Sequence, residues 1–148
     1  MPDAFGAKVT QFFLDRAHIA KKIGAAKVKA LMRSGGRMRI TAQRSMRYRV
    51  KGSSAPGAPP FAHKKRGALL RKLLFFFYDQ ASDSVVVGPV SSRKAEAPGL
   101  NEFGGTSKHT AKGKVIVAHY PPRPFMSPAL RLEEPKMPKE WANSISGP

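Results

Sequence analysis

Hydrophobic residues recur every three or four positions along the N-terminal part of the chain, which is the spacing of one face of an α-helix. Over residues 4–23 the positions that share this face are Phe5, Val9, Phe12, Ile19 and Ile23. Gly24 follows them and marks either a break or a bend. We therefore expect a first helix over residues 4–23.

Residues 26–51 combine a narrow apolar stripe with a row of cations on the opposite face. The stripe consists of Val28, Leu31, Gly35, Met38, Ala42 and Met46. The cations are Lys22, Lys29, Arg33, Arg37, Arg44, Arg47 and Lys51. One long helix explains both sets, although Gly35 and Gly36 each cost it about 1 kcal/mol and could split it, with Thr41 capping a second helix. In either case the arginines stay on one side and are expected to be exposed.

A pattern typical of β-structure follows a stretch rich in proline and glycine. Residues 52–67 predict a linker or extended arm, because proline excludes helix and the apolar content is too small for a core element. The apolar and aromatic run Leu69–Asp79 is followed by a polar turn at Asp79–Asp83 and by the run Ser84–Pro89. Together they predict a hairpin. A third strand is expected at Lys114–Tyr120, and residues 90–113 read as a long polar loop.

The hairpin is expected to pack on the apolar stripe of the long helix. The strand residues predicted to face the helix are Leu73, Phe75, Phe77, Val85 and Val87, and their predicted helix partners are Leu31, Met38 and Met46.

Near the C-terminus, Ser127 followed by Pro128 is a good helix start, because a capping hydroxyl precedes a residue that needs no backbone donor. Pro135 should end this helix, and Pro138 should open a last turn that carries Trp141. The expected fold is therefore α+β, in a single domain over residues 1–148. It has long N-terminal amphipathic basic helices, a small antiparallel sheet with a hairpin, a short C-terminal helix and extended arms.

Charge is distributed unevenly between the two halves of the chain. Residues 1–72 hold 18 Lys and Arg against 2 Asp and Glu, a net +16, whereas residues 73–148 hold 9 against 7, a net +2. A compact monomer with such a charge repels itself, so the asymmetry favours a polyanionic or acidic partner. A merely solubilising surface is the alternative, but it does not require the charge to lie in one half.

The lengths of the apolar runs and the absence of cysteine argue against a membrane protein, a secreted protein and a disulfide-linked or thiolate metal-binding protein. The longest uninterrupted apolar run, Leu73–Tyr78, is far shorter than the roughly 20 residues of a membrane helix. Charged residues interrupt the apolar stretch near the N-terminus, which argues against a signal peptide. The chain has no cysteine, hence no disulfide framework and no thiolate metal site. We expect synthesis and assembly in a cytoplasm, with no membrane contact.

No pattern typical of an enzyme is present. The carboxylates are scattered, and the adjacent pair Glu133 and Glu134 would diverge by about 100° on a helix. The histidines, which are His18, His63, His109 and His119, lack the spacing of metal ligands. We therefore expect no catalytic, cofactor or metal site. Replacing any one histidine, or Glu102, should leave assembly intact unless folding suffers.

Four segments together resemble a known family. Tyr120–Leu130 is similar to the Pro-x-Arg-Pro-Phe-Met-x-Pro-Ala-Leu signature of tailed-bacteriophage neck proteins, a family described as tail components, tail-completion or virion morphogenesis proteins. The segment from Arg44 through the Pro-Gly-Ala-Pro-Pro arm, the strand Ser84–Pro89 and Asn101–Gly105 resemble further parts of that family. Asn101 departs from the histidine that the family usually has. The resemblance covers roughly residues 25–145.

The resemblance implies a non-catalytic protein of the virion neck, at the head–tail connection, which forms a ring between the portal-side head closure and the tail tube. Its expected partners are copies of itself and a neighbouring adaptor, stopper, tail terminator or tail tube protein. Genome DNA, bound without sequence preference, is a further partner if the basic face lines the channel. Residues expected at subunit interfaces are Phe61, Lys64, Lys65, Arg66, Arg123, Phe125 and Met126. For Phe125 a place in the domain's own core is an equal alternative.

Two questions stay open at this level. The contact residues Arg33, Arg37, Arg44, Arg47 and Lys51 either line a DNA channel or dock on acidic faces of adjacent rings. A different class, a basic nucleic-acid-binding module such as a ribosomal protein, also explains the charge. It does not explain the Arg-Pro-Phe-Met segment or the apolar hairpin.

Overall fold

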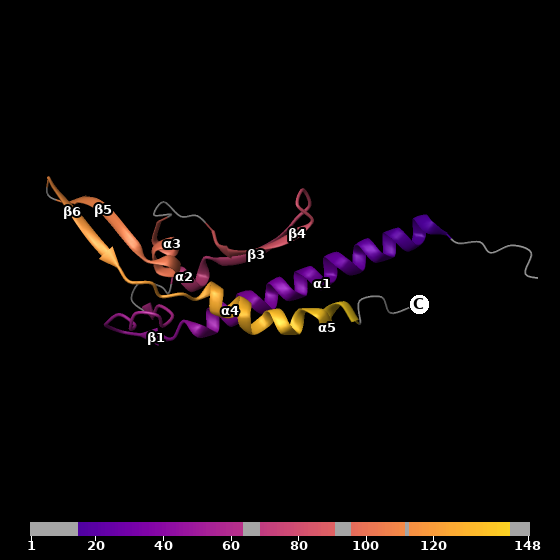
Figure 1. Ribbon diagram of the computed structural model, residues 1–148, viewed down its shortest axis with the longest axis horizontal. Helices are drawn as coiled ribbons and strands as arrows, with labels where there is room; N and C mark the ends of the chain where they lie inside the picture. Colours follow the sequence, from indigo (N-terminus) through magenta and orange to yellow (C-terminus); the bar gives the residue numbers. More distant parts are fainter. Residues whose placement is uncertain (1–14, 64–68, 91–95, 112, 143–148) are drawn as a thin grey trace, which may run out of the picture.

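The computed structural model describes residues 15–63, 69–90, 96–111 and 113–142 (Figure 1). The helices are α1 (Arg16–Ser45), α2 (Leu69–Lys72), α3 (Glu96–Phe103), α4 (Met126–Glu133) and α5 (Met137–Ala142), with a 3-10 turn over Glu134–Lys136. The strands are β1 (Tyr48–Arg49), β2 (Ala62–His63), β3 (Leu74–Asp79), β4 (Ser84–Pro89), β5 (Gly105–Ala111) and β6 (Lys114–Tyr120). This mixture of long helix and antiparallel hairpins confirms the α+β prediction.

Helix α1 is continuous, so neither Gly24 nor the pair Gly35 and Gly36 interrupts it. Asp15 caps its first turn by accepting a hydrogen bond from the His18 backbone nitrogen at 2.9 Å. The helix ends at Ser45, and the following Met46 is extended. The prediction that helix continues to Lys51 is therefore wrong, because Tyr48 and Arg49 instead pair as a strand. Residues 4–14 of the first expected helix lie outside the described residues.

The hairpin β3–β4 packs on α1, and glycine makes the close approach possible. A Cβ built on Gly35 would lie 2.7 Å from Val85 Cγ2 and 3.2 Å from Phe76 Cδ2, and one on Gly36 would lie 3.4 Å from Phe76 Cζ. The two glycines thus form a flat strip on which the hairpin lies. Their cost to the helix is offset by this packing, which explains why α1 does not split.

The strand β3 presents the opposite set of side chains to the helix from the one predicted. Leu74 is fully buried and Phe76 contacts the glycine strip, whereas Phe75 and Phe77 are 48% and 57% exposed. The prediction for Phe75 and Phe77 is therefore wrong, and Leu73 precedes the strand. Because the run Leu73–Tyr78 is apolar at every position, the alternation of apolar and polar residues could not indicate which face of the strand packs on the helix. On β4, Val85 and Val87 face α1 as expected.

The third strand has the predicted bounds, and its partner is a strand that the sequence did not predict. Strand β6 pairs antiparallel with β5, from Gly105 opposite Tyr120 to Ala111 opposite Lys114. The described strands form three separate two-stranded sheets rather than one small sheet. The long loop predicted over residues 90–113 is wrong, because this stretch contains α3 and β5. The polar composition of this stretch hid both elements.

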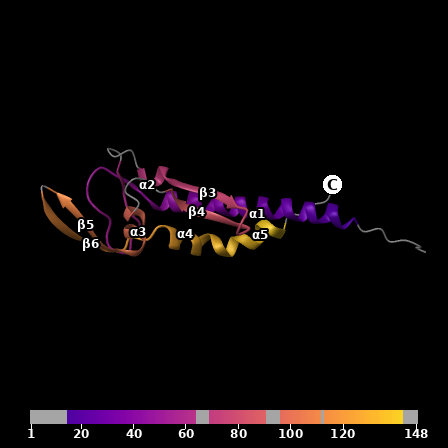
Figure 2. The same ribbon diagram turned by 90° about the horizontal axis from the view of Figure 1, so that it is seen from above.

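The C-terminal segment returns along α1 on the side opposite the hairpin (Figure 1). Seen from above, α4 and α5 follow one another beside α1 (Figure 2). As predicted, α4 gives way at Pro135 to a short turn, and a last helix carries Trp141. The start of α4 differs from the prediction: it begins at Met126, and Ser127 is not its cap residue.

A carboxylate from another element takes the place of that cap. Glu102, at the end of α3, accepts hydrogen bonds from the backbone nitrogens of Phe125, Met126 and Ser127 at 2.8–3.0 Å and from the Ser127 hydroxyl at 2.6 Å. Burial, the largest single influence, acts to raise the pKa of Glu102. The hydrogen bonds together outweigh it, so the pKa lies below the ordinary glutamate value. Glu102 therefore joins the α3–β5–β6 unit to α4.

The apolar core lies where the C-terminal half of α1 meets β3 and α4. Its buried members are Ala42, Met46, Leu74, Phe125 and Ala129, with Met38, Leu70 and Met126 packed against them. Phe125 is 1% exposed. Its ring therefore fills the domain's own core, which is the alternative given for Phe125. Met126 packs against the same core, and its contact with another subunit stays a prediction.

The predicted arm folds back on the domain over its described part. The Gly57 nitrogen donates to the Pro122 carbonyl at 2.8 Å, and Arg123 Nε donates to the Ser54 carbonyl at 2.9 Å. Strand β2 then pairs parallel with β1. Arg123 thus clamps the arm within the chain, and its contact with another subunit stays a prediction. No helix in the described part of the chain is both long and apolar enough to span a membrane.

Candidate polyanion-binding surface

Two cations of α1, Lys27 and Arg37, are neutralised by carboxylates from elements that pack on the helix. Lys27 pairs with Asp83 in the β3–β4 turn. Arg37 Nη2 lies 2.7 Å from Glu140 Oε1 on α5, with half of the arginine side chain still exposed. These contacts help to hold the hairpin and α5 against the helix.

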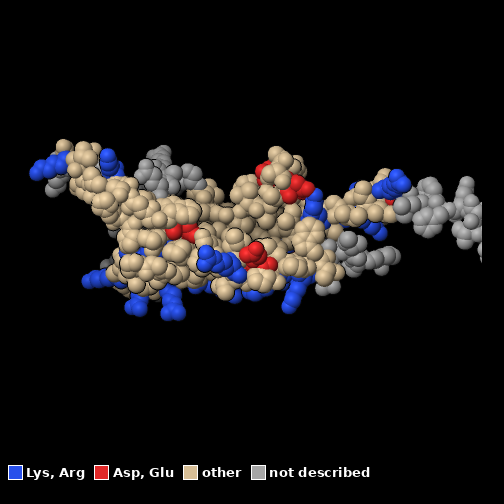
Figure 3. Space-filling view, in the orientation of Figure 1, with Lys and Arg blue, Asp and Glu red and all other residues tan. Residues whose placement is uncertain are grey.

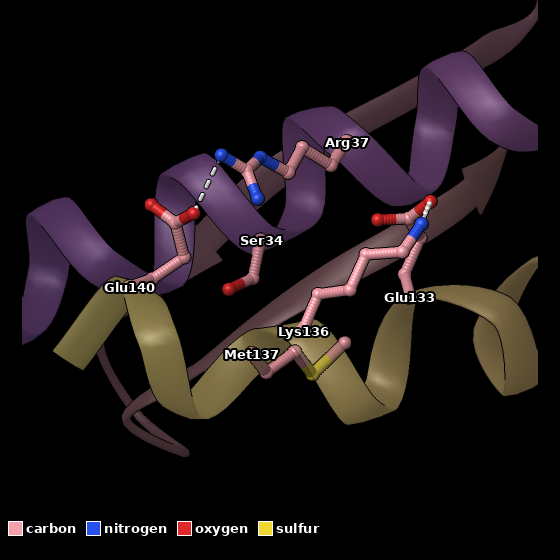
Figure 4. A pocket seen from close by; sticks show the side chains of 6 residues that line it. All are labelled: Ser34, Arg37, Glu133, Lys136, Met137 and Glu140. Carbon is pink, nitrogen blue, oxygen red and sulfur yellow. Dashed lines mark hydrogen bonds and ion pairs between the residues drawn. The ribbon is translucent and has the colours of Figure 1, made fainter. Parts of the chain in front are cut away.

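A second carboxylate completes the contact between α1 and the C-terminal helices (Figure 4). Glu133 accepts a hydrogen bond from Lys136 Nζ at 2.9 Å, which is drawn in Figure 4. It accepts another from Thr41 Oγ1 at 2.7 Å. Lys136, followed by the Thr41 hydroxyl, holds the pKa of this buried carboxyl below its ordinary value. The hollow lined by these side chains is too small to hold a ligand. It is a contact between helices, not a binding site.

The C-terminal end of α1 lacks such compensation. Arg44, Arg47, Arg49 and Lys51 are exposed, and none of them lies within ion-pair distance of a described carboxylate. The sequence has no Asp or Glu between Asp15 and Asp79, so no acidic side chain is a near neighbour in the chain. The positive charge at this end is therefore available to an external anion.

Two aromatic rings order part of this charge. The Arg71 guanidinium lies over the Tyr48 ring at 4.5 Å, and that of Arg49 lies over the Phe61 ring at 5.3 Å. Gln43 Nε2 donates to the Arg71 carbonyl at 2.9 Å, which fixes α2 beside the end of α1. A guanidinium stacked on a ring keeps its N–H edges free to bind oxygens of a phosphate or carboxylate.

We call this surface the basic end. It consists of Arg44, Arg47, Arg49, Lys51 and Arg71 with the rings of Tyr48 and Phe61. Figure 3 shows Lys and Arg side chains projecting from the molecule at the end that carries β1. Carboxylates gather instead over the β3–β4 turn and along the contact between α1 and the C-terminal helices.

The structure separates the predicted contact residues into two groups. Arg33, Arg44, Arg47 and Lys51 are exposed as expected, and of these only Arg33 lies away from the basic end. Arg37 is exposed but engaged with Glu140. Phe61 belongs to the basic end through its stack with Arg49. Lys64, Lys65 and Arg66 lie outside the described residues.

Sequence reasoning missed Arg49 and Arg71 because neither follows the helical row of cations. Arg49 lies on β1, and Arg71 comes from α2, on the far side of the arm. The available signal was local: a tyrosine and a phenylalanine occur among clustered cations, a composition typical of cation–π stacking.

The basic end offers cations and hydrogen-bond donors but no acid, base or nucleophile set. Within the described residues, no group of three His, Cys, Asp or Glu side chains is placed to hold a metal ion. No family model, curated protein or solved structure matches the chain.

Proposed function

We propose that this chain is a structural component of the neck of a tailed bacteriophage. In this proposal it assembles as a ring between the portal-side head closure and the tail tube. The observation that carries the proposal is the uncompensated basic end, joined to the family-like Arg-Pro-Phe-Met segment through the arm that Arg123 clamps. The basic end faces either DNA in the central channel or the acidic face of an adjacent ring.

The distribution of contacts supports a structural part rather than an enzyme. The polar groups that are buried hold elements together, as Glu102 and Glu133 do. Exposed cations occur along the whole subunit, but those of the basic end lie close together with no described carboxylate beside them, so that a polyanion would contact several of them at once. Contacts of this kind bind phosphates without reading bases.

The basic end predicts a specific change in DNA binding. Replacing Arg44, Arg47, Arg49 and Lys51 together with Gln should lower the affinity for duplex DNA and flatten its dependence on salt. The slope of log affinity against log salt should fall by about 3 to 4 if each cation contacts a phosphate. Fluorescence anisotropy with a labelled duplex at several salt concentrations measures this.

The matched control removes the same charge elsewhere. Arg16, Lys21, Lys22 and Lys29 are exposed on the N-terminal half of α1, and their replacement by Gln should change the slope by much less. Equal effects of both variants would mean that net charge alone governs binding. The basic-end variant should also impair head–tail joining in particles, and normal infectious particles would contradict the proposal.

A basic nucleic-acid-binding module such as a ribosomal protein is distinguished by what the purified protein holds. The neck proposal predicts a defined oligomer free of RNA in a native mass measurement. A monomer that retains RNA after nuclease treatment would favour the other class.

A further inference from the structure

The hairpin β5–β6 projects from one end of the molecule (Figure 1). Apolar side chains are exposed on both of its faces. Val115 and Val117 share one face and are 67% and 49% exposed, and Ile116 is exposed on the other. Lys108 is paired with Val117 in the ladder, so its side chain lies on the face of the two valines. An isolated two-stranded hairpin is marginally stable in water, so this unit favours a cover.

The outer face of β3–β4 is a second, partly exposed apolar surface. It presents Phe75 and Phe77 from β3 and Val86 from β4, and Phe77 is directly opposite Val86 in the ladder. The Arg39 guanidinium lies over the Phe75 ring, 5.7 Å from its centroid, so Phe77 and Val86 form the open part of this face. Asp79 follows on the same face at the turn, because side chains alternate along a strand. No described cation is within ion-pair distance of Asp79, and its bonds from the Ser82 hydroxyl and the Ala81 nitrogen hold its pKa low. The carboxylate is therefore charged at neutral pH.

We propose that the valine face of β5–β6 of one copy packs on the outer face of β3–β4 of a second copy of this chain. The two faces match in polarity and charge. The β5–β6 face has Val115 and Val117 beside the cation Lys108. The β3–β4 face has Phe75, Phe77 and Val86 beside the carboxylate of Asp79. Packing sheet on sheet buries both apolar strips, and the lysine then meets an acidic turn. In Figure 3, Lys and Arg side chains lie at the end of the molecule that carries β5–β6, and Asp and Glu side chains lie over the β3–β4 turn.

A second copy fits these surfaces better than the same molecule does. The two faces lie at different positions along the long axis, since β3–β4 packs on α1 and β5–β6 extends past the end of it (Figures 1 and 2). Two different patches that bind one another make a head-to-tail contact, and repetition of that contact closes a ring if the rotation allows. The inference rests on the proposed function only in requiring a ring.

The test exploits the absence of cysteine from the chain. Two separately tagged variants, Val117→Cys and Val86→Cys, are mixed and treated with a short bis-maleimide cross-linker. Packed sheets lie about 10 Å apart, which is too far for a direct disulfide. The expected product is a cross-linked pair that carries both tags. Val86→Cys mixed with Ile23→Cys, a position exposed on the free part of α1, is the control and should give little product.

A second measurement does not depend on cross-linking. Replacing Val115 and Val117 together with Thr keeps β-branched side chains in the hairpin but removes apolar surface. Self-association measured by sedimentation should weaken by about tenfold or more. The matched change Ile116→Thr, on the other face of β6, should have a much smaller effect. Circular dichroism confirms that each variant is folded.

The outcomes separate this inference from the proposed function. A cross-link between the two cysteine variants, together with weaker association of the valine variant, supports it even if the protein proves absent from phage particles. Mixed pairs no more frequent than in the control overturn it. Such a result overturns the inference even if the protein is found in a virion neck, because a different protein would then cover these two faces.

Discussion

The two long hairpins of this protein have similar lengths and the same antiparallel pairing, yet they are held in opposite ways. In β3–β4, one face is pressed on the glycine strip of α1, and Leu74 reaches the core. In β5–β6, both faces are open, and the unit is joined to the rest through α3 and the Glu102 cap. Their strands alone do not explain this difference. The difference arises because α1 covers one face of β3–β4, whereas no described element covers either face of β5–β6.

The comparison shows where stability and where binding should be found. A face packed in the domain contributes to folding, and an open apolar face is available to a partner at little cost to folding. Substitutions on the inner face of β3–β4 should therefore unfold the protein. Those on its outer face, or on β5–β6, should alter assembly instead.

The largest expected effect is on the inner face of β3. Leu74→Ala should lower the free energy of unfolding by about 2–5 kcal/mol, because it leaves a cavity in the core. Phe77→Ala, on the outer face of the same strand, should cost less than about 1 kcal/mol in the isolated subunit. Urea unfolding of both variants measures the difference. Equal losses would mean that the outer face is also packed within the domain.

The next effect concerns the attachment of β5–β6. Glu102→Gln should cost about 1–3 kcal/mol, because one amide oxygen cannot replace a carboxylate that accepts four hydrogen bonds. The sequence predicted that replacing Glu102 leaves assembly intact unless folding suffers. Since Glu102 contributes to folding in the structure, this condition applies to the Glu102→Gln variant.

The same carboxylate predicts a dependence on pH. Since folding lowers the pKa of Glu102, its contribution to stability is present above the ordinary value of about 4.5 and is lost as the pH falls through the lowered pKa. Melting temperatures of the wild type and Glu102→Gln should therefore converge as the solution is acidified from neutral pH. A constant difference between them at every pH would contradict the role of the charge.

The smallest effect has opposite signs at two glycines of one helix. Gly35→Ala should destabilise the protein by about 1–3 kcal/mol, because the added methyl meets Val85 at 2.7 Å. Gly24→Ala has open space around it and should stabilise the helix by about 0.5–1 kcal/mol. Thermal unfolding checks both, and stabilisation by both substitutions would show that the hairpin does not lie on the glycine strip.

Local patterns in the sequence predicted the elements whose signals are strong. The long helix, the turn between β3 and β4, the bounds of β6 and the short final helix all followed from periodicity, proline and glycine. The face that β3 presents did not follow, because Leu74 and Phe75 are equally apolar and only the position of α1 distinguishes them. Strand β5 was missed because the hairpin β5–β6 does not pack on the core. The residues of β5 therefore show no alternation of apolar and polar positions.

The candidate site divides in the same way. The exposure of Arg44 followed from the helical pattern, and that of Arg47 and Lys51, which lie beyond the end of α1, from the cost of burying charge alone. The neutralisation of Arg37 did not follow, because Glu140 is distant in sequence and meets it only through the return of the chain. The stacking of Arg71 on Tyr48 likewise depends on a long-range contact.

A density map of the neck of an assembled particle, resolved well enough to place α1 and the two hairpins, tests the central claim most directly. The proposal predicts a closed ring of this chain between the portal-side proteins and the tail tube, with the basic end at the DNA channel or against an adjacent acidic ring. Particles whose neck is complete and contains no copy of the chain would contradict it.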